Sequence, residues 1–261
     1  MKKIIFVFLL VWAFNFSYGE DNEVFYPGEE LVYEVSFLGI NLGEVKVFAI
    51  EKDIYEGKNV YYAKATMQSN PSIPYASLSA IFESWMSPNM NYSYKFEGNT
   101  KFGSDGDWVY QKMLMNYEKE NIKVERWIDR KKVMDHTLET TSKANDGCSL
   151  FFLAREYVDS KKRVKVPTII DKTIDYTYIN FWGRKEKKEI DAVEYPIKTV
   201  YFDGRADWKG IYGLNGEFEG WFTDDEANIP VKAKMQVYVG SVDLELIRWK
   251  RGSWQPPKWE K

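Results

Sequence analysis

The side chains that could do catalytic chemistry are few. His136 and Cys148 are the only histidine and the only cysteine among the 261 residues. A Ser-His-Asp triad would need His136 as its base, but the sequence has no G-x-S-x-G motif to present a nucleophile. A histidine-rich zinc site would need two or three histidines. We therefore interpret His136 as an ordinary strand residue.

Cys148 falls in the first turn of a predicted helix, where the helix dipole can lower the pKa of a thiol. A reactive pair of Cys148 and His136 is therefore conceivable. The same position on an apolar helix also suits a small buried residue. We favour the packing interpretation, and we expect no catalytic residue in this chain.

Carboxylates suggest two further kinds of site. Three consecutive acids, Asp224-Asp225-Glu226, could bind a hard cation, and Asp105 with Asp107 invites the same idea. The three consecutive acids lack the alternate spacing and glycine of a calcium loop, and a solvated turn is the favoured interpretation for both groups. Glycoside hydrolysis needs two carboxylates, and a chain with 39 acidic residues always offers some pair. Such a pair in the sequence is therefore no evidence for this activity. No nucleotide-binding motif is present, and we expect no metal and no cofactor.

Apolar and polar residues alternate along most of the chain, which predicts strands with one buried face. The pattern is clearest at 31–37, 61–68 and 231–239, and the 10 Trp, 18 Tyr and 16 Phe favour long strands. Weaker patterns cover residues 43–51, 79–86, 91–102, 108–117, 121–128, 131–139, 163–170, 173–181, 184–190, 194–202 and 217–223, and residues 242–249 follow 231–239 as the second arm of a hairpin. Hairpin turns joining antiparallel strands are predicted at Glu56-Gly57, Asp105-Gly106, Asp203-Gly204 and Gly240-Ser241.

One segment departs from this alternation. Asp146 can cap a helix that runs to about Val158, with about eight strands before it and about seven after it. We therefore expect an all-β, mainly antiparallel fold with one main helix. The sheet should be curved, or a half-open barrel, and should continue into a sandwich-like second half.

The first 19 residues resemble a secretory signal peptide. Lys2 and Lys3 precede an apolar run, and small residues precede a predicted cut after Gly19. Removing the two lysines changes the formal charge from −3 to −5, which disfavours nucleic-acid binding. No later segment is apolar enough to span a membrane. We therefore expect a periplasmic protein.

The mature chain is predicted to hold one β-rich domain over residues 20–252. Its two lobes, about 20–145 and 159–252, are joined by the helix at 146–158. Residues 253–261 form a tail rich in Trp and Pro, which we expect to be extended.

Three groups of residues occur in this order: Phe25-x-Pro27-Gly28-Glu29-x-Leu31-x-Tyr33 with Gly39 and Gly43, Asp146-x-x-Ser149 with Arg155, and Trp221-x-Thr223-Asp224-Asp225 with Ile229-Pro230-Val231. Together they resemble the exported bacterial family catalogued as domain of unknown function 3108. The last group is also similar to a strand pair of periplasmic lipoprotein carriers, which are half-open barrels with helices covering an apolar cavity. The resemblance assigns no catalytic residue, and Cys148 and the tail depart from the pattern.

Three functions remain open. The first is a non-catalytic protein that binds or carries a lipid or a lipoprotein in a cavity beneath the helix. The second is a scaffold that binds another envelope protein through a sheet edge or the tail. The third is glycan binding, which a solvent-open aromatic strip with two nearby carboxylates would favour. Core packing is the competing interpretation for the predicted ligand contacts of the first function, which are Tyr33, Phe37, Leu150, Phe151, Leu153 and Tyr157.

Overall fold

The computed structural model describes residues 24–73, 77–210, 215–237 and 240–260. The predicted signal peptide and its cut after Gly19 lie outside the described residues. Within the described part, no helix has the length and apolarity that crossing a membrane requires.

The described chain forms fourteen strands and one α-helix, followed by a short 3-10 helix. The first eight strands are β1 (Glu29–Phe37), β2 (Ile40–Tyr55), β3 (Lys58–Ser69), β4 (Leu78–Met86), β5 (Ser93–Phe102), β6 (Trp108–Asn116), β7 (Asn121–Ile128) and β8 (Lys131–Glu139). The helices are α1 (Gly147–Glu156) and η1 (Val158–Ser160). The last six strands are β9 (Arg163–Ile170), β10 (Thr173–Lys188), β11 (Ile197–Ala206), β12 (Gly216–Thr223), β13 (Pro230–Gln236) and β14 (Ser241–Lys250).

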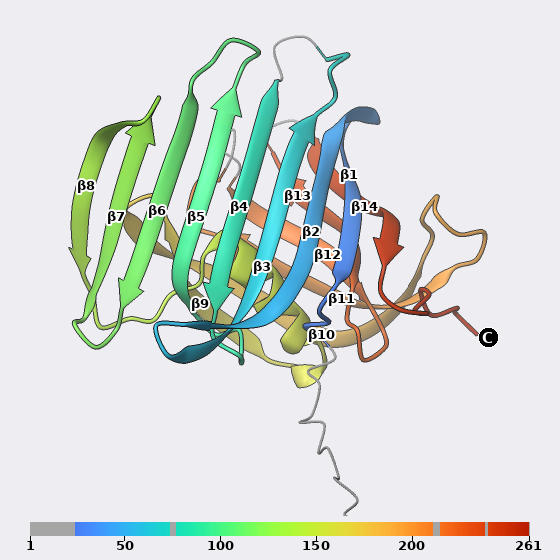
Figure 1. The fold of residues 1–261 in the computed structure, drawn as a ribbon. Coiled ribbons are helices and arrows are strands. Elements are labelled where there is room, and N and C mark those ends of the chain that lie inside the picture. The colour runs from blue at the N-terminus through green and yellow to red at the C-terminus, as the bar shows by residue number, and fades with distance from the viewer. Residues whose placement is uncertain (1–23, 74–76, 211–214, 238–239, 261) are drawn as a thin grey trace, which may run out of the picture.

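All fourteen strands belong to one antiparallel sheet. Its order is β8-β7-β6-β5-β4-β3-β2-β1-β14-β13-β12-β11-β10-β9, so the sheet ends at β8 and β9 and is not closed into a barrel. Figure 1 shows β1 to β8 as a front layer, with β9 to β14 behind it and α1 between the layers. The helix contacts β3 and β4 in front and β9 behind. The predicted fold class is confirmed.

The start of α1 is fixed by Asp146, as its position before an apolar helix predicts. The Asp146 carboxylate accepts hydrogen bonds from the backbone N–H groups of Cys148 (2.7 Å) and Ser149 (2.9 Å). Its other oxygen accepts one from the Ser84 hydroxyl of β4 (2.6 Å). The same side chain therefore fixes the N-terminus of the helix and attaches it to the front layer. The α-helix stops at Glu156, slightly before the predicted end.

Two predictions about the second half of the chain are wrong. Asp203-Gly204 is not a turn, because both residues lie inside β11 and pair with β10 and β12. A Cβ on Gly204 would lie 2.2 Å from the carbonyl oxygen of Tyr178 and 2.4 Å from the Phe218 ring. Close packing, rather than a turn, therefore explains this glycine.

The predicted strands 173–181 and 184–190 are one strand, β10. A bulge between Phe181 and Arg184 shifts its register against β11. Gly183 lies in this bulge with φ +64°, a left-handed conformation that β-bulges often contain and that glycine adopts readily. The second half therefore has six strands rather than about seven.

Candidate functional site

Five of the six predicted ligand contacts lie on α1 or next to it. Tyr33 and Leu153 belong to the main buried core, and Leu150, Phe151 and Tyr157 are half-buried against it. Phe37 is half-buried at the far end of β1, beside the hairpin that leads to β14. The structure brings the helix residues and Tyr33 together but leaves Phe37 apart from them.

Protein side chains pack closely against the inner face of α1. The ring centroids of Tyr33 and Phe151 lie 6.2 Å apart in an edge-on arrangement, and those of Phe25 and Phe152 lie 5.3 Å apart. The Tyr33 hydroxyl is buried and has no hydrogen-bond partner among the described residues. Burial raises the pKa of this hydroxyl well above its usual value.

The three sequence groups that carry the family resemblance meet in the core. The guanidinium of Arg155 binds the Glu29 carboxylate through two nitrogens, at 2.6 and 3.1 Å. Arg155 also donates to the Ala227 carbonyl (2.9 Å), and Arg251 donates to Glu29 (2.6 Å). Glu29 and Arg155 are 1% and 0% exposed. This network connects β1, α1 and the turn after β12, so we assign these residues a structural role.

The two residues considered for nucleophilic chemistry lie in different environments. His136 is exposed on the edge strand β8, whereas Cys148 is buried in the first turn of α1. Burial, with the charge of Asp146 as a second cause, raises the pKa of the Cys148 thiol. A raised pKa disfavours the reactive thiolate, which agrees with the packing interpretation of Cys148.

The acids between β12 and β13 form a turn, as predicted, but their side chains are engaged. Asp224 forms ion pairs with Lys185 and Lys198, each at 2.8 Å. Asp225 accepts hydrogen bonds from the Thr223 hydroxyl (2.6 Å) and the Trp254 indole (2.7 Å). Among the described residues, no three His, Cys, Asp or Glu side chains form a group that could hold a metal ion.

The tail is extended and bound to the rest of the molecule. The backbone N–H of Lys198 donates to the Pro257 carbonyl, and that of Trp259 donates to Pro196, each at 2.8 Å. The Tyr195 hydroxyl donates to the Pro256 carbonyl (3.0 Å). These bonds would have to break before the tail could bind another protein in an extended form, so the structure gives no support to partner binding through the tail.

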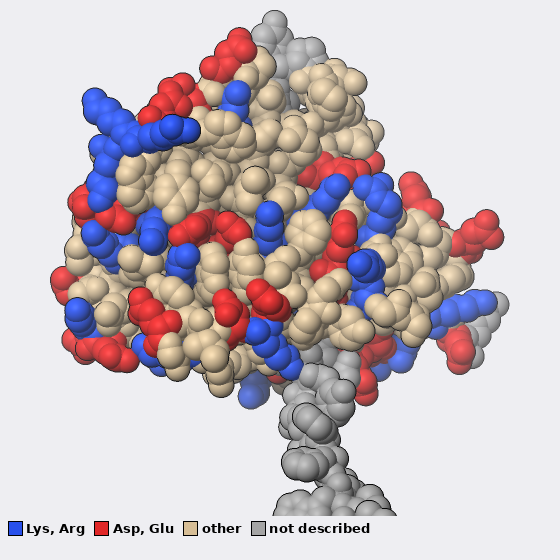
Figure 2. Space-filling view, viewed as in Figure 1, with Lys and Arg blue, Asp and Glu red and all other residues tan. Residues whose placement is uncertain are grey.

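Charges of both signs are interspersed over the outer face of the front layer (Figure 2). Many of them form local pairs, such as Lys95 with Glu97 (2.9 Å) and Lys123 with Glu125 (2.8 Å). This face therefore has no single-sign field that would attract a polyanion.

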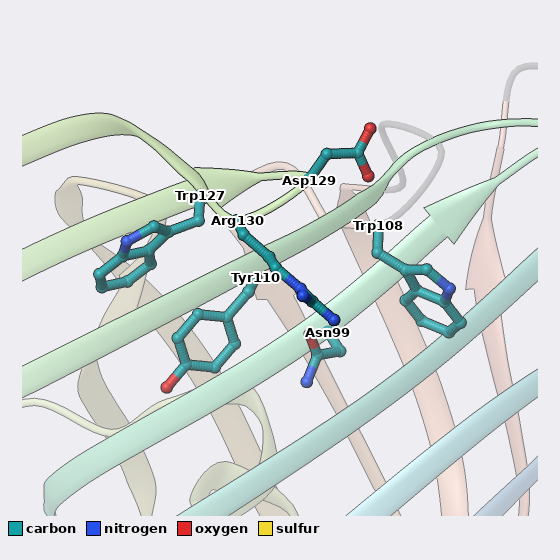
Figure 3. A pocket seen from close by; sticks show the side chains of 6 residues that line it. All are labelled: Asn99, Trp108, Tyr110, Trp127, Asp129 and Arg130. Atoms are coloured by element: carbon teal, nitrogen blue, oxygen red, sulfur yellow. The ribbon is translucent and has the colours of Figure 1, made fainter.

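A hollow of about 630 Å³ opens on this outer face, over β5, β6 and β7. The strand register explains why aromatic residues gather there. Asn99 lies opposite Tyr110, and Tyr110 lies opposite Trp127, so the three side chains project from the same face of neighbouring strands. Figure 3 shows the six lining side chains, which are Asn99, Trp108, Tyr110, Trp127, Asp129 and Arg130.

The aromatic rings of the hollow are partly open to solvent. The rings of Tyr110 and Trp127 lie 5.1 Å apart at 38°, and Trp108 is 42% exposed. Burial, followed by interaction with Glu97, raises the pKa of Tyr110. Tyr110 is therefore a neutral hydrogen-bonding group at physiological pH.

A strained hairpin turn borders the hollow. Asp129 and Arg130 join β7 to β8 with φ values of +45° and +67°. A two-residue turn of this kind strongly favours Asn-Gly or Asp-Gly, because only glycine adopts positive φ without steric cost. In Figure 3 the Arg130 side chain extends toward Asn99, while the Asp129 carboxylate points away. Interaction with Asp107 raises the pKa of Asp129.

The sequence prediction missed this hollow. We expected a site on a sheet face near the helix. The lining side chains of the hollow instead project from the front of β5 to β7 in Figure 3, with the rear layer behind the sheet. The available signal was the alternate spacing of Trp108 and Tyr110 on one predicted strand and the presence of Trp127 on the next.

A solved structure shares this fold. The crystal structure of a beta-barrel-like protein of domain of unknown function DUF1849 from Brucella abortus aligns with a TM-score of 0.56 and 10% identity. The alignment covers 87% of this chain and 99% of that chain. At this identity the similarity concerns the fold alone.

No curated protein matches the sequence. The family model described as protein of unknown function (DUF3108) matches residues 32–247, which span the strands from β1 to β14, α1 and the hollow. The chain therefore belongs to the DUF3108 family.

Proposed function

We propose that this chain is an exported, non-catalytic binding protein of the cell envelope, and that the hollow over β5 to β7 holds a saccharide. Export is supported by the pattern of residues 1–19. The non-catalytic part is supported by the environments of His136 and Cys148, one exposed on an edge strand and the other buried with a raised thiol pKa.

The observation that carries the proposal is the composition of the hollow. A sugar ring presents an apolar face of C–H groups and a rim of hydroxyls, so it needs flat apolar surfaces next to hydrogen-bonding groups. Trp108, Tyr110 and Trp127 supply the surfaces, and Asn99 and Arg130 supply the polar groups. The volume of about 630 Å³ is within the usual range for small-ligand sites.

The direction of the Asp129 carboxylate favours binding over hydrolysis. The Asp129 carboxylate points away from the other lining side chains (Figure 3), and its recorded carboxylate neighbour is Asp107. A glycosidase instead directs two carboxyl groups at one glycosidic bond from either side. We therefore assign Asp129 a role in the turn rather than in bond cleavage.

Binding to an array of oligosaccharides tests this proposal. Wild-type protein should bind a subset of the array, and Trp108→Ala and Trp127→Ala should each weaken that binding about tenfold or more. Trp182→Ala is the matched control, because Trp182 is 45% exposed, close to the 42% of Trp108, but lies on β10 in the rear layer. Loss of binding in the control alone, or no binding by the wild type, would contradict the proposal.

A second candidate function is binding of an apolar or amphiphilic ligand, such as a lipid or lipoprotein, between the layers. One observation favours it: the buried Tyr33 hydroxyl has no partner among the described residues, although most buried polar groups in proteins do. Native mass spectrometry of protein purified from membrane-containing cells should then show a bound lipid. A spectrum of the ligand-free mass alone would argue against it.

A further inference from the structure

We infer that the saccharide bound by this protein carries an anionic group, a carboxylate or a phosphate, and that Arg130 binds it. This inference rests on the proposed saccharide-binding function and specifies the chemical class of the ligand.

The first argument is that Arg130 has no internal partner, in contrast to every other arginine. Among the described residues, no hydrogen bond, ion pair or ring contact is recorded for its guanidinium. The other seven arginines each bind a carboxylate or lie over an aromatic ring. These pairs are Arg126 with Asp171, Arg155 and Arg251 with Glu29, Arg163 with Trp182, Arg184 with Glu186, Arg205 with Asp207, and Arg248 with Glu44.

The second argument is the position of Arg130 in the backbone. Its φ of +67° is a conformation in which glycine would be less strained. The side chain gains no recorded contact within the protein that would offset this strain. Eight other described non-glycine residues also have a positive φ, including Glu56 and Asp171 in hairpin turns, so the strain at Arg130 supports the inference only together with the missing partner.

The third argument is the direction of the side chain. Figure 3 shows the guanidinium of Arg130 between Tyr110 and Trp108 and close to the Asn99 amide, so this exposed side chain extends over the other lining residues of the hollow. The neighbouring acid, Asp129, points away from the guanidinium and interacts with Asp107. The positive charge therefore remains available to a ligand lying on the aromatic rings.

A guanidinium group suits one ligand chemistry in particular. Its planar fork can donate two parallel hydrogen bonds to a carboxylate or phosphate, and such charge-assisted bonds are stronger than neutral ones. A sugar that stacks on Tyr110 or Trp108 would bring a group on its rim next to Arg130. A uronic acid or a phosphorylated sugar has the required anion at that rim.

The test compares oligosaccharides of one linkage in neutral, C6-carboxylate and 6-phosphorylated forms, on an array and by calorimetry. Wild-type protein should bind the anionic forms about 10- to 100-fold more tightly than the neutral form, the range expected for a hydrogen bond to a charged group. Raising the salt from 50 to 500 mM should reduce this preference. The carboxylate and phosphate forms distinguish the two sources of the anion.

Arg130→Gln should lose the preference and its salt dependence while still binding the neutral form. Lys119→Gln is the matched control, because it removes the same charge from an exposed site in the turn at the opposite end of β6 and β7. It should behave as the wild type. Arg130→Lys should retain part of the preference, because it keeps the charge but not the fork.

Equal binding of neutral and anionic forms by the wild type would overturn the inference, as would a preference that survives in Arg130→Gln. Either result would leave saccharide binding at the hollow intact. Failure to bind any oligosaccharide would overturn the proposed function together with the inference.

Discussion

Arg155 of α1 and Glu29 of β1 form an ion pair in the centre of the molecule, 126 positions apart in the sequence. Nη1 of Arg155 lies 2.6 Å from Oε1 of Glu29, and the two side chains are almost completely buried. Because Arg251 of the chain segment after β14 binds the same carboxylate, one buried acid holds two cations. The pair fixes the helix that lies between the two layers of the sheet.

Glu29→Gln should therefore destabilise the protein strongly. It leaves two buried guanidinium groups without a counter-charge, which typically costs about 3–5 kcal/mol. Arg155→Met should lower the free energy of unfolding by less, because Glu29 keeps its ion pair with Arg251. Glu44→Gln is the control, since Glu44 pairs with Arg248 at the surface, where the loss should be below about 1 kcal/mol. Urea unfolding followed by tryptophan fluorescence measures all three; equal losses for Glu29→Gln and Glu44→Gln would refute a structural role for the buried network.

Tyr33→Phe should raise the free energy of unfolding by about 1 kcal/mol, because it removes a buried hydroxyl without a recorded partner. Tyr117→Phe should lower it by a similar amount. The Tyr117 hydroxyl donates to the Ser93 carbonyl at 2.7 Å and accepts from the Ala144 N–H at 3.2 Å. If Tyr33→Phe also loses stability, the hydroxyl has a partner in solution, and ligand binding between the layers gains support.

Arg130→Gly should leave the free energy of unfolding unchanged or raise it by up to about 1 kcal/mol. Glycine relieves the strain at φ +67°, partly offset by the greater freedom that it gives the unfolded chain. Arg130→Ala keeps the strain and should match the wild type. Thermal unfolding separates the two, and a loss of more than about 1 kcal/mol in Arg130→Gly would show that the arginine stabilises the fold.

Acid should weaken the contact between Asp224 and its lysines. Burial alone would raise the pKa of Asp224, but hydrogen bonds from Lys185 and Lys198 outweigh it and lower the pKa below its usual value. A lowered folded-state pKa means that the stabilisation is complete above the unfolded value of about 3.9 and is lost as pH falls through the folded value. Asp224→Asn should therefore lose about 1 kcal/mol at pH 7, and this deficit should shrink as pH falls through the folded-state pKa of Asp224. A deficit independent of pH would contradict this assignment.

Local signals in the sequence predicted the parts of the fold that local physics controls. Asp146 caps α1 because a carboxylate before an apolar helix satisfies the free N–H groups of its first turn. Gly57 turns the chain with φ +75° after Glu56, as its position between two alternating segments predicts.

Long-range relationships account for what the sequence prediction missed. The sequence indicated a turn at Gly204, but glycine occurs there because Tyr178 and Phe218 of the neighbouring strands approach the backbone closely. The hollow depends in the same way on register, which places Asn99, Tyr110 and Trp127 side by side only when three strands pair as they do. Alternation shows which residues share a face of one strand, but not which strands are neighbours.

The most direct test of saccharide binding at the hollow is an NMR titration of the tryptophan indole N–H signals with the tightest oligosaccharide from the array. The account predicts that the signals of Trp108 and Trp127 shift together with increasing ligand, while those of Trp182 and Trp254 stay in place. Shifts confined to Trp182 and Trp254, or no shift at saturating ligand, would contradict it.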